Sequence, residues 1–114
     1  MKKTLLTAIA LTFMASGAFA HAAAEKTTPA NEAAVETVDV IEIRFDNPMR
    51  VIAITVAGPE GDVTIERETG MDAVTEFRAV PSGELVAGNY SVDWRALSPD
   101  GHPMQGSFSF DVEG

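Results

Sequence analysis

The sequence contains no cysteine. Without thiolates, catalysis by a nucleophilic cysteine is excluded, and so are cysteine-ligated zinc, iron–sulfur and blue-copper sites. Disulfide bonds are excluded as well, so packing must stabilise the fold. Histidine is nearly as scarce, since the chain has two, His21 and His102. Any histidine-dependent metal site must therefore use these two imidazoles.

Basic residues are also few. Eight Lys and Arg residues stand against seventeen Asp and Glu residues, which gives a net charge of −9. Such a surface argues against nucleic-acid binding, because that function needs a basic footprint. The acidic balance favours cations mildly, although an acidic surface is more often a solubility feature.

Long hydrophobic runs are missing too. The main apolar run, residues 5–14, is shorter than the roughly 20 apolar residues that a membrane span requires, and we find no second hydrophobic span. Two lysines precede the run, and Ala18-Phe19-Ala20 follows it with the small-x-small pattern of signal peptidase cleavage. We therefore predict a signal peptide over residues 1–20, cleavage after Ala20, and a soluble mature protein in the periplasm.

Cleavage would leave one domain of 94 residues, 21–114. It removes two of the eight basic residues and no acidic residue, so six basic and seventeen acidic residues give the mature domain a net charge of −11. It also makes His21 the first residue, whose free α-amine and imidazole Nδ1 can chelate one metal ion together. By position alone His21 would be an ordinary flanking residue, so its role depends on the rest of the chain.

Residues 22–37 are small and polar and include Pro29, which interrupts a helix, so we predict a mostly irregular N-terminal arm over residues 21–37. After the arm, apolar and polar residues alternate with the two-residue period of half-buried strands. A further strand is expected near residues 63–65, and a weaker one over residues 74–80. The inward-facing residues that the alternation predicts are Ile41, Ile43, Phe45, Ile52, Ile54, Val56, Tyr90, Val92, Trp94, Phe108, Phe110 and Val112.

Turn sequences separate these segments, from Asp46-Asn47-Pro48 to residues 98–101. Six or seven short strands in about 75 residues, without a long helical period, predict an all-β fold. The expected architecture is a small Greek-key antiparallel β-sandwich of the immunoglobulin-like kind. Trp94 lies on an alternating face beside Tyr90 and Val92, so we expect it to pack in the core and not to form a surface that binds a ligand.

Asp100-Gly101-His102 lies in the predicted loop between the last two strands. Alternate residues of an extended segment project to the same side, so the carboxylate and the imidazole can project together. Gly101 permits a sharp course of the backbone, and Pro99 and Pro103 stiffen its flanks. An Asp-x-His sequence alone is a weak signal, because most such sequences are polar turns in which Asp bonds its own backbone.

The placement of both histidines makes a metal site the stronger hypothesis. A flexible arm could bring His21 back over the end of the sandwich. The pooled donors would then be the α-amine and imidazole of His21, the imidazole of His102 and a carboxylate oxygen of Asp100. Three nitrogens and one oxygen suit tetragonal Cu(II), which heads the Irving–Williams order. We therefore predict one Cu(II) ion bound by His21, Asp100 and His102.

Three parts of the chain carry a family pattern. They are the junction that creates His21, the segment Phe45-Asp46-Asn47-Pro48, and the stretch 88–110. The stretch runs Gly-x-Tyr-x-Val-x-Trp-Arg through Ser-x-Asp-Gly-His-Pro to Gly-x-Phe-x-Phe. With these motifs the chain resembles the CopC family of periplasmic copper-binding, copper-resistance proteins. The resemblance implies a small Greek-key β-sandwich and Cu(II) ligation by His21, Asp100 and His102. It also implies that the protein sequesters copper, or delivers it to a membrane copper transporter of the CopD type, and is not an enzyme.

Other functions remain open. An N-terminal histidine that holds copper is also the site of lytic polysaccharide monooxygenases, although this small domain lacks an extended aromatic surface for polysaccharide. A metal-free adhesive β-sandwich is disfavoured by the placement of both histidines. Some family members bind Cu(I) through a methionine-rich loop, but here Met49, Met71 and Met104 are scattered. We therefore expect weak Cu(I) binding, with Met49 and Met71 as packing residues. Met104, two residues from His102, either lines the loop or approaches the metal, and we favour the first.

Overall fold

The computed structural model describes the backbone of residues 20–21 and all of residues 24–114. The signal peptide that we predict for residues 1–20 lies outside the described residues except for the backbone of Ala20, so its cleavage stays a prediction. Within the described part of the chain, no helix is long and apolar enough to cross a membrane.

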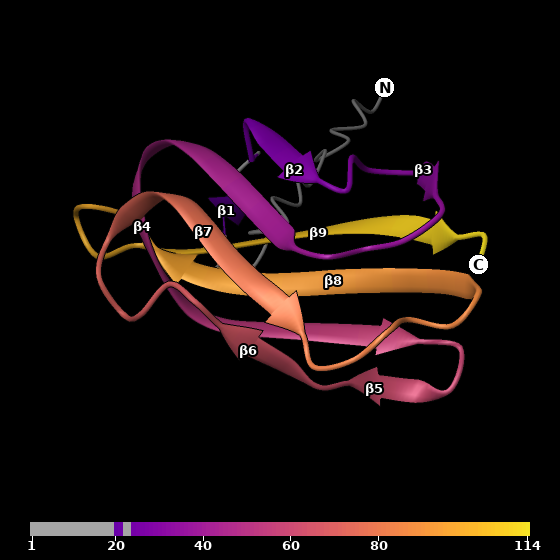
Figure 1. Ribbon diagram of the computed structural model, residues 1–114. Coiled ribbons are helices and arrows are strands. Elements are labelled where there is room, and N and C mark those ends of the chain that lie inside the picture. Colours follow the sequence, from indigo (N-terminus) through magenta and orange to yellow (C-terminus); the bar gives the residue numbers. More distant parts are fainter. Residues whose placement is uncertain (1–19, 22–23) are drawn as a thin grey trace, which may run out of the picture.

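The described chain is all-β, as the alternation predicts (Figure 1). Five of its strands have three residues or fewer, which is why the described segments outnumber the six or seven strands expected from the sequence. The strands are β1 (Ala20–His21), β2 (Lys26–Thr28), β3 (Ala33–Val35), β4 (Ile41–Gly58), β5 (Gly61–Val63), β6 (Ile65–Arg67), β7 (Val74–Pro81), β8 (Gly88–Leu97) and β9 (Pro103–Val112).

The strands form two layers that share β4. In one layer, β9 pairs with β8, β8 pairs with the second half of β4, and this half of β4 pairs with β5. In the other layer, the first half of β4 pairs with β2 and β7, and β7 pairs with β6. These pairs are all antiparallel, and the expected β-sandwich is confirmed. The short strands β1 and β3 differ from the expected pattern, because both pair with β9 in parallel.

The course of β4 corrects the sequence analysis. The register of β4 shifts between Arg44 and Met49, where the strand leaves the layer of β2, β6 and β7, and again between Val51 and Ala53. The turn that we predict at Asp46-Asn47-Pro48 is wrong, because these residues continue the strand through the first irregularity. Proline is tolerated at such an irregularity, since no ladder hydrogen bond is required from its nitrogen.

The second register shift is a β-bulge whose extra residue is Ile52. Val51 pairs with Ala96 and Ala53 pairs with Arg95, so Ile52 has no partner opposite it. Ile52 is 41% exposed, whereas Val51 is buried. The prediction that Ile52 faces the core is therefore wrong, because a bulge interrupts the period of two that the prediction assumed.

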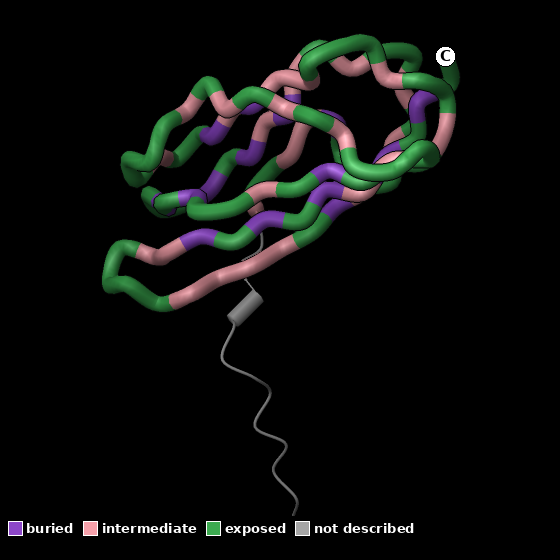
Figure 2. The backbone as a smooth tube through the Cα atoms, turned by 90° about the horizontal axis from the view of Figure 1, so that it is seen from below, coloured by how far each residue is buried: buried purple, intermediate pink, exposed green. Residues whose placement is uncertain are grey.

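The core lies between the two layers, and buried residues alternate with exposed ones along the long strands (Figure 2). Trp94 is buried as expected and packs edge-on against Phe45, with ring centroids 5.1 Å apart. Tyr90 stacks on Phe110 at 5.5 Å. Every residue predicted to face inward is buried except Ile52 and the half-buried Ile54. The buried apolar residues are Ile41, Ile43, Phe45, Met49, Val51, Val56, Phe77, Ala79, Tyr90, Val92, Trp94, Ala96, Phe108, Phe110 and Val112.

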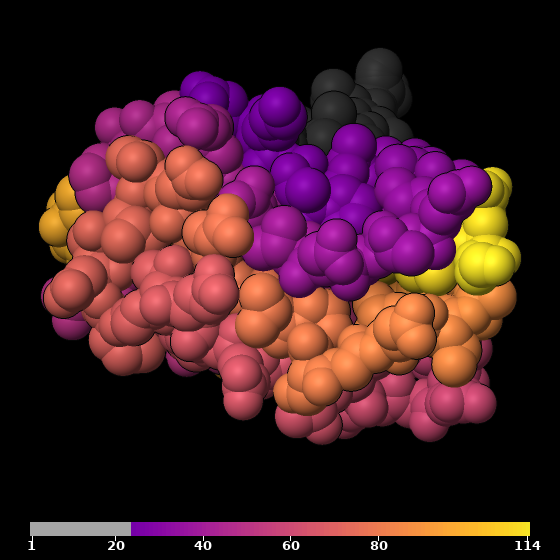
Figure 3. Space-filling model, viewed as in Figure 1, coloured from indigo at the N-terminus to yellow at the C-terminus, as the bar shows by residue number. Residues whose placement is uncertain are grey.

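The N-terminal arm contains more regular structure than its composition indicates. β2 pairs with β4, and β3 runs parallel to the end of β9, with Ala33 opposite Phe110 and Val35 opposite Val112. Asn31 also accepts a hydrogen bond from the Ser109 backbone through its side-chain oxygen. The arm therefore lies against the body of the domain, next to the C-terminal end of β9 (Figure 3).

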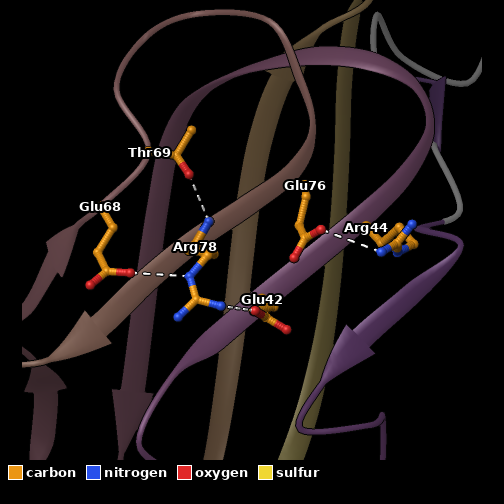
Figure 4. A network of polar contacts seen from close by, with 6 residues as sticks. All are labelled: Glu42, Arg44, Glu68, Thr69, Glu76 and Arg78. Carbon is orange, nitrogen blue, oxygen red and sulfur yellow. Dashed lines mark hydrogen bonds and ion pairs between the residues drawn. The ribbon is translucent and has the colours of Figure 1, made fainter.

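The layer of β4 and β7 carries a set of exposed or half-buried ion pairs, which we call the β4–β7 charge network (Figure 4). Arg78 on β7 contacts Glu42 on β4, its direct cross-strand partner, and its Nε lies 3.1 Å from Glu68. Arg44 and Glu76 also face one another across the strands, 3.3 Å apart. Opposite charges at paired positions favour this register of the two strands.

Candidate metal centre

The loop Ser98–His102 connects β8 to β9 and carries two of the three predicted copper ligands. The last paired residues of the two strands, Leu97 and Pro103, lie directly on either side of the loop. Within it, the Gly101 N–H donates to the Ser98 carbonyl at 2.8 Å, and the Ser98 N–H donates to the His102 carbonyl at 2.9 Å. Gly101 has φ of 88°, a left-handed conformation that glycine adopts without a steric penalty. A long, paired hairpin thus ends in a tight loop closed by its own backbone.

Asp100 and His102 meet in this loop. Asp100 Oδ2 lies 2.8 Å from His102 Nδ1, and the two side chains are 68% and 74% exposed. The other carboxylate oxygen, Oδ1, accepts a hydrogen bond from the Ser98 hydroxyl. The prediction that the carboxylate and the imidazole project together is therefore confirmed.

These contacts stabilise the ionised form of Asp100. The pKa of its carboxyl is lowered from its ordinary value to about 2, first by the hydrogen bond from Ser98 and then by the one from His102. Asp100 is consequently a carboxylate at neutral pH. A carboxylate can only accept hydrogen bonds, so the contact with His102 holds the proton of a neutral imidazole on Nδ1. Nε2 is then the nitrogen whose lone pair can bind a metal ion.

The geometry leaves two roles available to Asp100. Its oxygen could bind the metal directly, as the sequence predicts, if Oδ2 moves away from His102. Alternatively it could keep its contact with Nδ1 and orient the imidazole, a common arrangement around metal-bound histidine. Both roles need the ionised carboxylate that the loop maintains.

His21 is placed only through its backbone. β1 runs parallel to β9, with Ala20 opposite Met104 and His21 opposite Gln105. Gln105 is three residues beyond His102, a separation of roughly 10 Å along a strand. The His21 side chain lies outside the described residues, so its part in a metal site stays a prediction. Over residues 24–114, no group of three or more His, Asp or Glu side chains is arranged to hold a metal ion. Asp100 and His102 alone supply only part of a coordination shell.

The three methionines within residues 24–114 do not gather at this loop. Met49 is buried, as expected of a packing residue, and Met104 is half-buried against the core. Met71 is 52% exposed, so the prediction that it packs in the core is wrong. It lies in the exposed segment between β6 and β7.

Sequence reasoning missed Ser98, which it treated as an ordinary turn residue. In the structure Ser98 bonds to both Asp100 and His102. A signal was present, since Ser and Thr hydroxyls often bond to groups two to four residues away. The sequence Ser98-Pro99-Asp100-Gly101-His102 places two such groups within that range.

A hollow of about 630 Å³ lies elsewhere, between the arm and the β8–β9 hairpin. Lys26 and Asn31 border it on one side, and Trp94 and Phe108 on the other. None of the loop residues Ser98–His102 is among its lining residues. The loop is instead an open, exposed end of the hairpin.

Comparison with known proteins relates the whole described domain to copper resistance. A family model for the CopC domain matches residues 24–113. Copper resistance protein C of Escherichia coli is 29% identical, over 99% of this chain and 98% of that protein. Copper resistance protein C of Xanthomonas campestris pv. juglandis is 27% identical, over 96% of this chain and 94% of that protein.

Two solved structures resemble the fold closely. PcoC, described as a methionine-rich copper resistance protein from Escherichia coli, superposes with a TM-score of 0.64 and 28% identity, covering 82% of this chain and 100% of that one. CopC from Methylosinus trichosporium OB3b superposes with a TM-score of 0.68 and 25% identity, covering 82% of this chain and 94% of that one.

Proposed function

This chain belongs to the CopC family of copper resistance proteins, and we propose that it binds one Cu(II) ion in the periplasm through His21, Asp100 and His102. The α-amine and imidazole of His21 supply two nitrogens after cleavage behind Ala20. His102 supplies a third nitrogen, and Asp100 supplies an oxygen. The domain, residues 21–114, then acts as a copper-binding protein and not as an enzyme.

The observation that carries the proposal is the contact between Asp100 and His102. The two side chains are exposed and lie 2.8 Å apart at the tip of a hairpin, where a metal ion can reach them from solvent. The contact leaves Nε2 of His102 available. The backbone of His21 lies beside the same end of β9, which favours a site completed by the mature N-terminus.

The chemistry of the donors favours Cu(II). Three nitrogens and one oxygen suit its tetragonal geometry, and Cu(II) binds such sites more tightly than Ni(II) or Zn(II) does. Cu(I) prefers soft sulfur ligands, and the chain has no cysteine. The relative PcoC is described as methionine-rich, whereas the methionines at positions 49, 71 and 104 are dispersed here. We therefore propose a protein that handles the oxidised ion.

We further propose that bound copper is sequestered or delivered to a membrane copper transporter of the CopD type. An exposed site at the tip of a hairpin would permit such transfer, since a receiving protein can approach the metal without unfolding the domain. In both roles the ion must remain bound to the domain, either throughout sequestration or until it reaches the transporter.

The experiment that tests the proposal compares three forms of the protein. The first begins at His21, the second carries one alanine before His21, and the third carries the same alanine after Gly114. We expect the first and third forms to bind one Cu(II) ion with nitrogen hyperfine structure in the EPR spectrum. The second form should bind far more weakly, because the added residue destroys the chelate of amine and imidazole. Equal affinity in all three forms would refute the amine as a ligand. Copper-dependent oxidation of polysaccharide with ascorbate would point instead to an enzyme.

A further inference from the structure

Ser98 is the residue to which both proposed ligands of the loop are bonded. Its hydroxyl donates to Asp100 Oδ1 and accepts the His102 N–H at 3.0 Å. Its carbonyl accepts the Gly101 N–H at 2.8 Å, and its own N–H donates to the His102 carbonyl at 2.9 Å. Four hydrogen bonds of the loop therefore converge on one half-buried residue at the end of β8.

We propose that Ser98 is a positioning residue of the copper site, whose hydroxyl sets the orientation of Asp100 and the backbone of His102. This inference rests on the proposed function. Ser98 holds Oδ1 of Asp100, which leaves Oδ2 as the oxygen that contacts His102 Nδ1. If Oδ2 leaves the imidazole to bind copper, the bond to Ser98 still keeps the carboxylate in place.

The need for such a residue follows from the exposure of the ligands. The Asp100 and His102 side chains are 68% and 74% exposed, so packing against the core does little to restrain them. A long or exposed side chain loses conformational entropy when a metal fixes it. Hydrogen bonds that already restrain the side chain reduce that loss, and this is how groups outside the coordination shell strengthen a metal site.

The contribution of the Ser98 hydroxyl can be tested separately from the contribution of the Ser98 backbone. Two of the four hydrogen bonds use backbone atoms of Ser98, and alanine at this position would keep them. The two bonds to Asp100 Oδ1 and to the His102 N–H use the hydroxyl, and alanine would remove them. A comparison of Ser98→Ala with Ser98→Thr therefore isolates the hydroxyl, because threonine retains it.

The test uses mature protein beginning at His21 in five forms: wild type, Ser98→Ala, Ser98→Thr, His102→Ala and the control Ser82→Ala. Ser82 is exposed in the loop after β7, near the start of β8, at the end of the domain away from Ser98. Cu(II) affinity is measured by competition with a chelator of known affinity, and the bound ion is examined by EPR. Amide hydrogen exchange at His102 and the thermal midpoint are measured without metal.

We expect Ser98→Ala to bind Cu(II) roughly 10- to 100-fold more weakly, the range typical of partners that orient metal ligands. Its EPR spectrum should change, the His102 amide should exchange faster, and the metal-free thermal midpoint should match that of wild type. Ser98→Thr should restore most of the affinity, and Ser82→Ala should behave as wild type.

Three results would overturn the inference while leaving the proposed function intact. Ser98→Ala could bind Cu(II) as wild type does, Ser98→Thr could be as weak as Ser98→Ala, or the loss of affinity could be matched by an equal loss of stability without metal. By contrast, a wild-type protein whose copper binding is absent, or insensitive to His102→Ala, would overturn the proposed function and this inference together.

Discussion

Two charge networks at the surface of this domain differ in whether they can bind a metal ion. In the β4–β7 charge network, Arg78 lies between Glu42 and Glu68 on a paired sheet (Figure 4). In the hairpin loop, Asp100 lies between the Ser98 hydroxyl and the His102 imidazole. In both networks, a carboxylate contacts the nitrogen atoms of a neighbouring side chain at the surface.

The networks differ in whether a nitrogen keeps a lone pair. The Arg78 guanidinium is always protonated and has no acceptor, and its pKa is raised further, first by the hydrogen bond with Glu68. It can only donate hydrogen bonds, and here it pairs with the carboxylates of Glu42 and Glu68, so the network favours one register of β4 and β7. His102 has a second nitrogen, and the loop leaves it exposed. Charged side chains at the surface thus serve strand pairing where the nitrogen group is the Arg78 guanidinium, and are suited to ligand binding where it is the His102 imidazole.

The largest effect that this comparison predicts is on copper affinity. His102→Ala should weaken Cu(II) binding by more than about 100-fold, beyond the range for residues outside the coordination shell, because a nitrogen donor is lost. Arg78→Ala should leave the affinity unchanged. Competition titrations of the mature proteins measure both. If Arg78→Ala weakened copper binding as much as His102→Ala, the division between the two networks would be wrong.

A smaller loss is expected from Asp100→Asn. The amide keeps the size of the side chain and an oxygen that can still bind the ion, but it removes the charge. We therefore expect a smaller loss than for His102→Ala, with Cu(II) bound about 10- to 100-fold more weakly. The matched change in the other network is Glu42→Gln, which should have no effect on copper. Titration and EPR of the two variants test this, and indistinguishable results for both would argue that the Asp100 charge plays no part.

The scaffold below the loop predicts an effect on stability. A Cβ added to Gly106 would lie 2.4 Å from Cζ2 of Trp94, whereas one added to Gly83 meets nothing within 4 Å. Gly106→Ala should therefore reduce the free energy of unfolding by about 1–3 kcal/mol, as overpacking typically does, and Gly83→Ala should change it little. Denaturant titration distinguishes them. Equal stability of the two variants would mean that Trp94 can move aside without cost.

The smallest effect is expected for the β4–β7 charge network itself. Arg78→Ala should lower the thermal midpoint slightly at low salt, because exposed ion pairs contribute little, and the difference from wild type should shrink at high salt. Thermal unfolding at two ionic strengths tests this. A large difference that persists at high salt would show that Arg78 stabilises the sheet by packing and not by charge.

Much of the fold follows from local pattern. The alternation around Tyr90, Val92 and Trp94 predicts a half-buried strand, and all three residues are buried in β8. The strand of Phe108 and Phe110 is equally well predicted. In these segments the period of two runs unbroken, and one pairing register buries all the apolar residues together.

The prediction is wrong where pairing overrides local signals. Asp46-Asn47-Pro48 is a typical turn sequence, yet it continues β4 because the strand pairs on both sides of it. Ile52 is exposed because it is the extra residue of a bulge. The strand β3 in the arm forms beside β9, whose paired residues are 77 positions away in the sequence, so its own composition cannot indicate this partner.

For the candidate site, the sequence by itself determined the available chemistry. No cysteine and two histidines restrict the donors, and Asp100-Gly101-His102 places a carboxylate near an imidazole. The tertiary structure alone decided that Asp100 contacts Nδ1 and leaves Nε2 available, that Ser98 bonds to both residues, and that β1 runs beside β9 near His102. The physical reason is that residue types set which groups can bind a metal, whereas distances and hydrogen-bond directions depend on how distant segments pair and on the conformation the closed loop adopts.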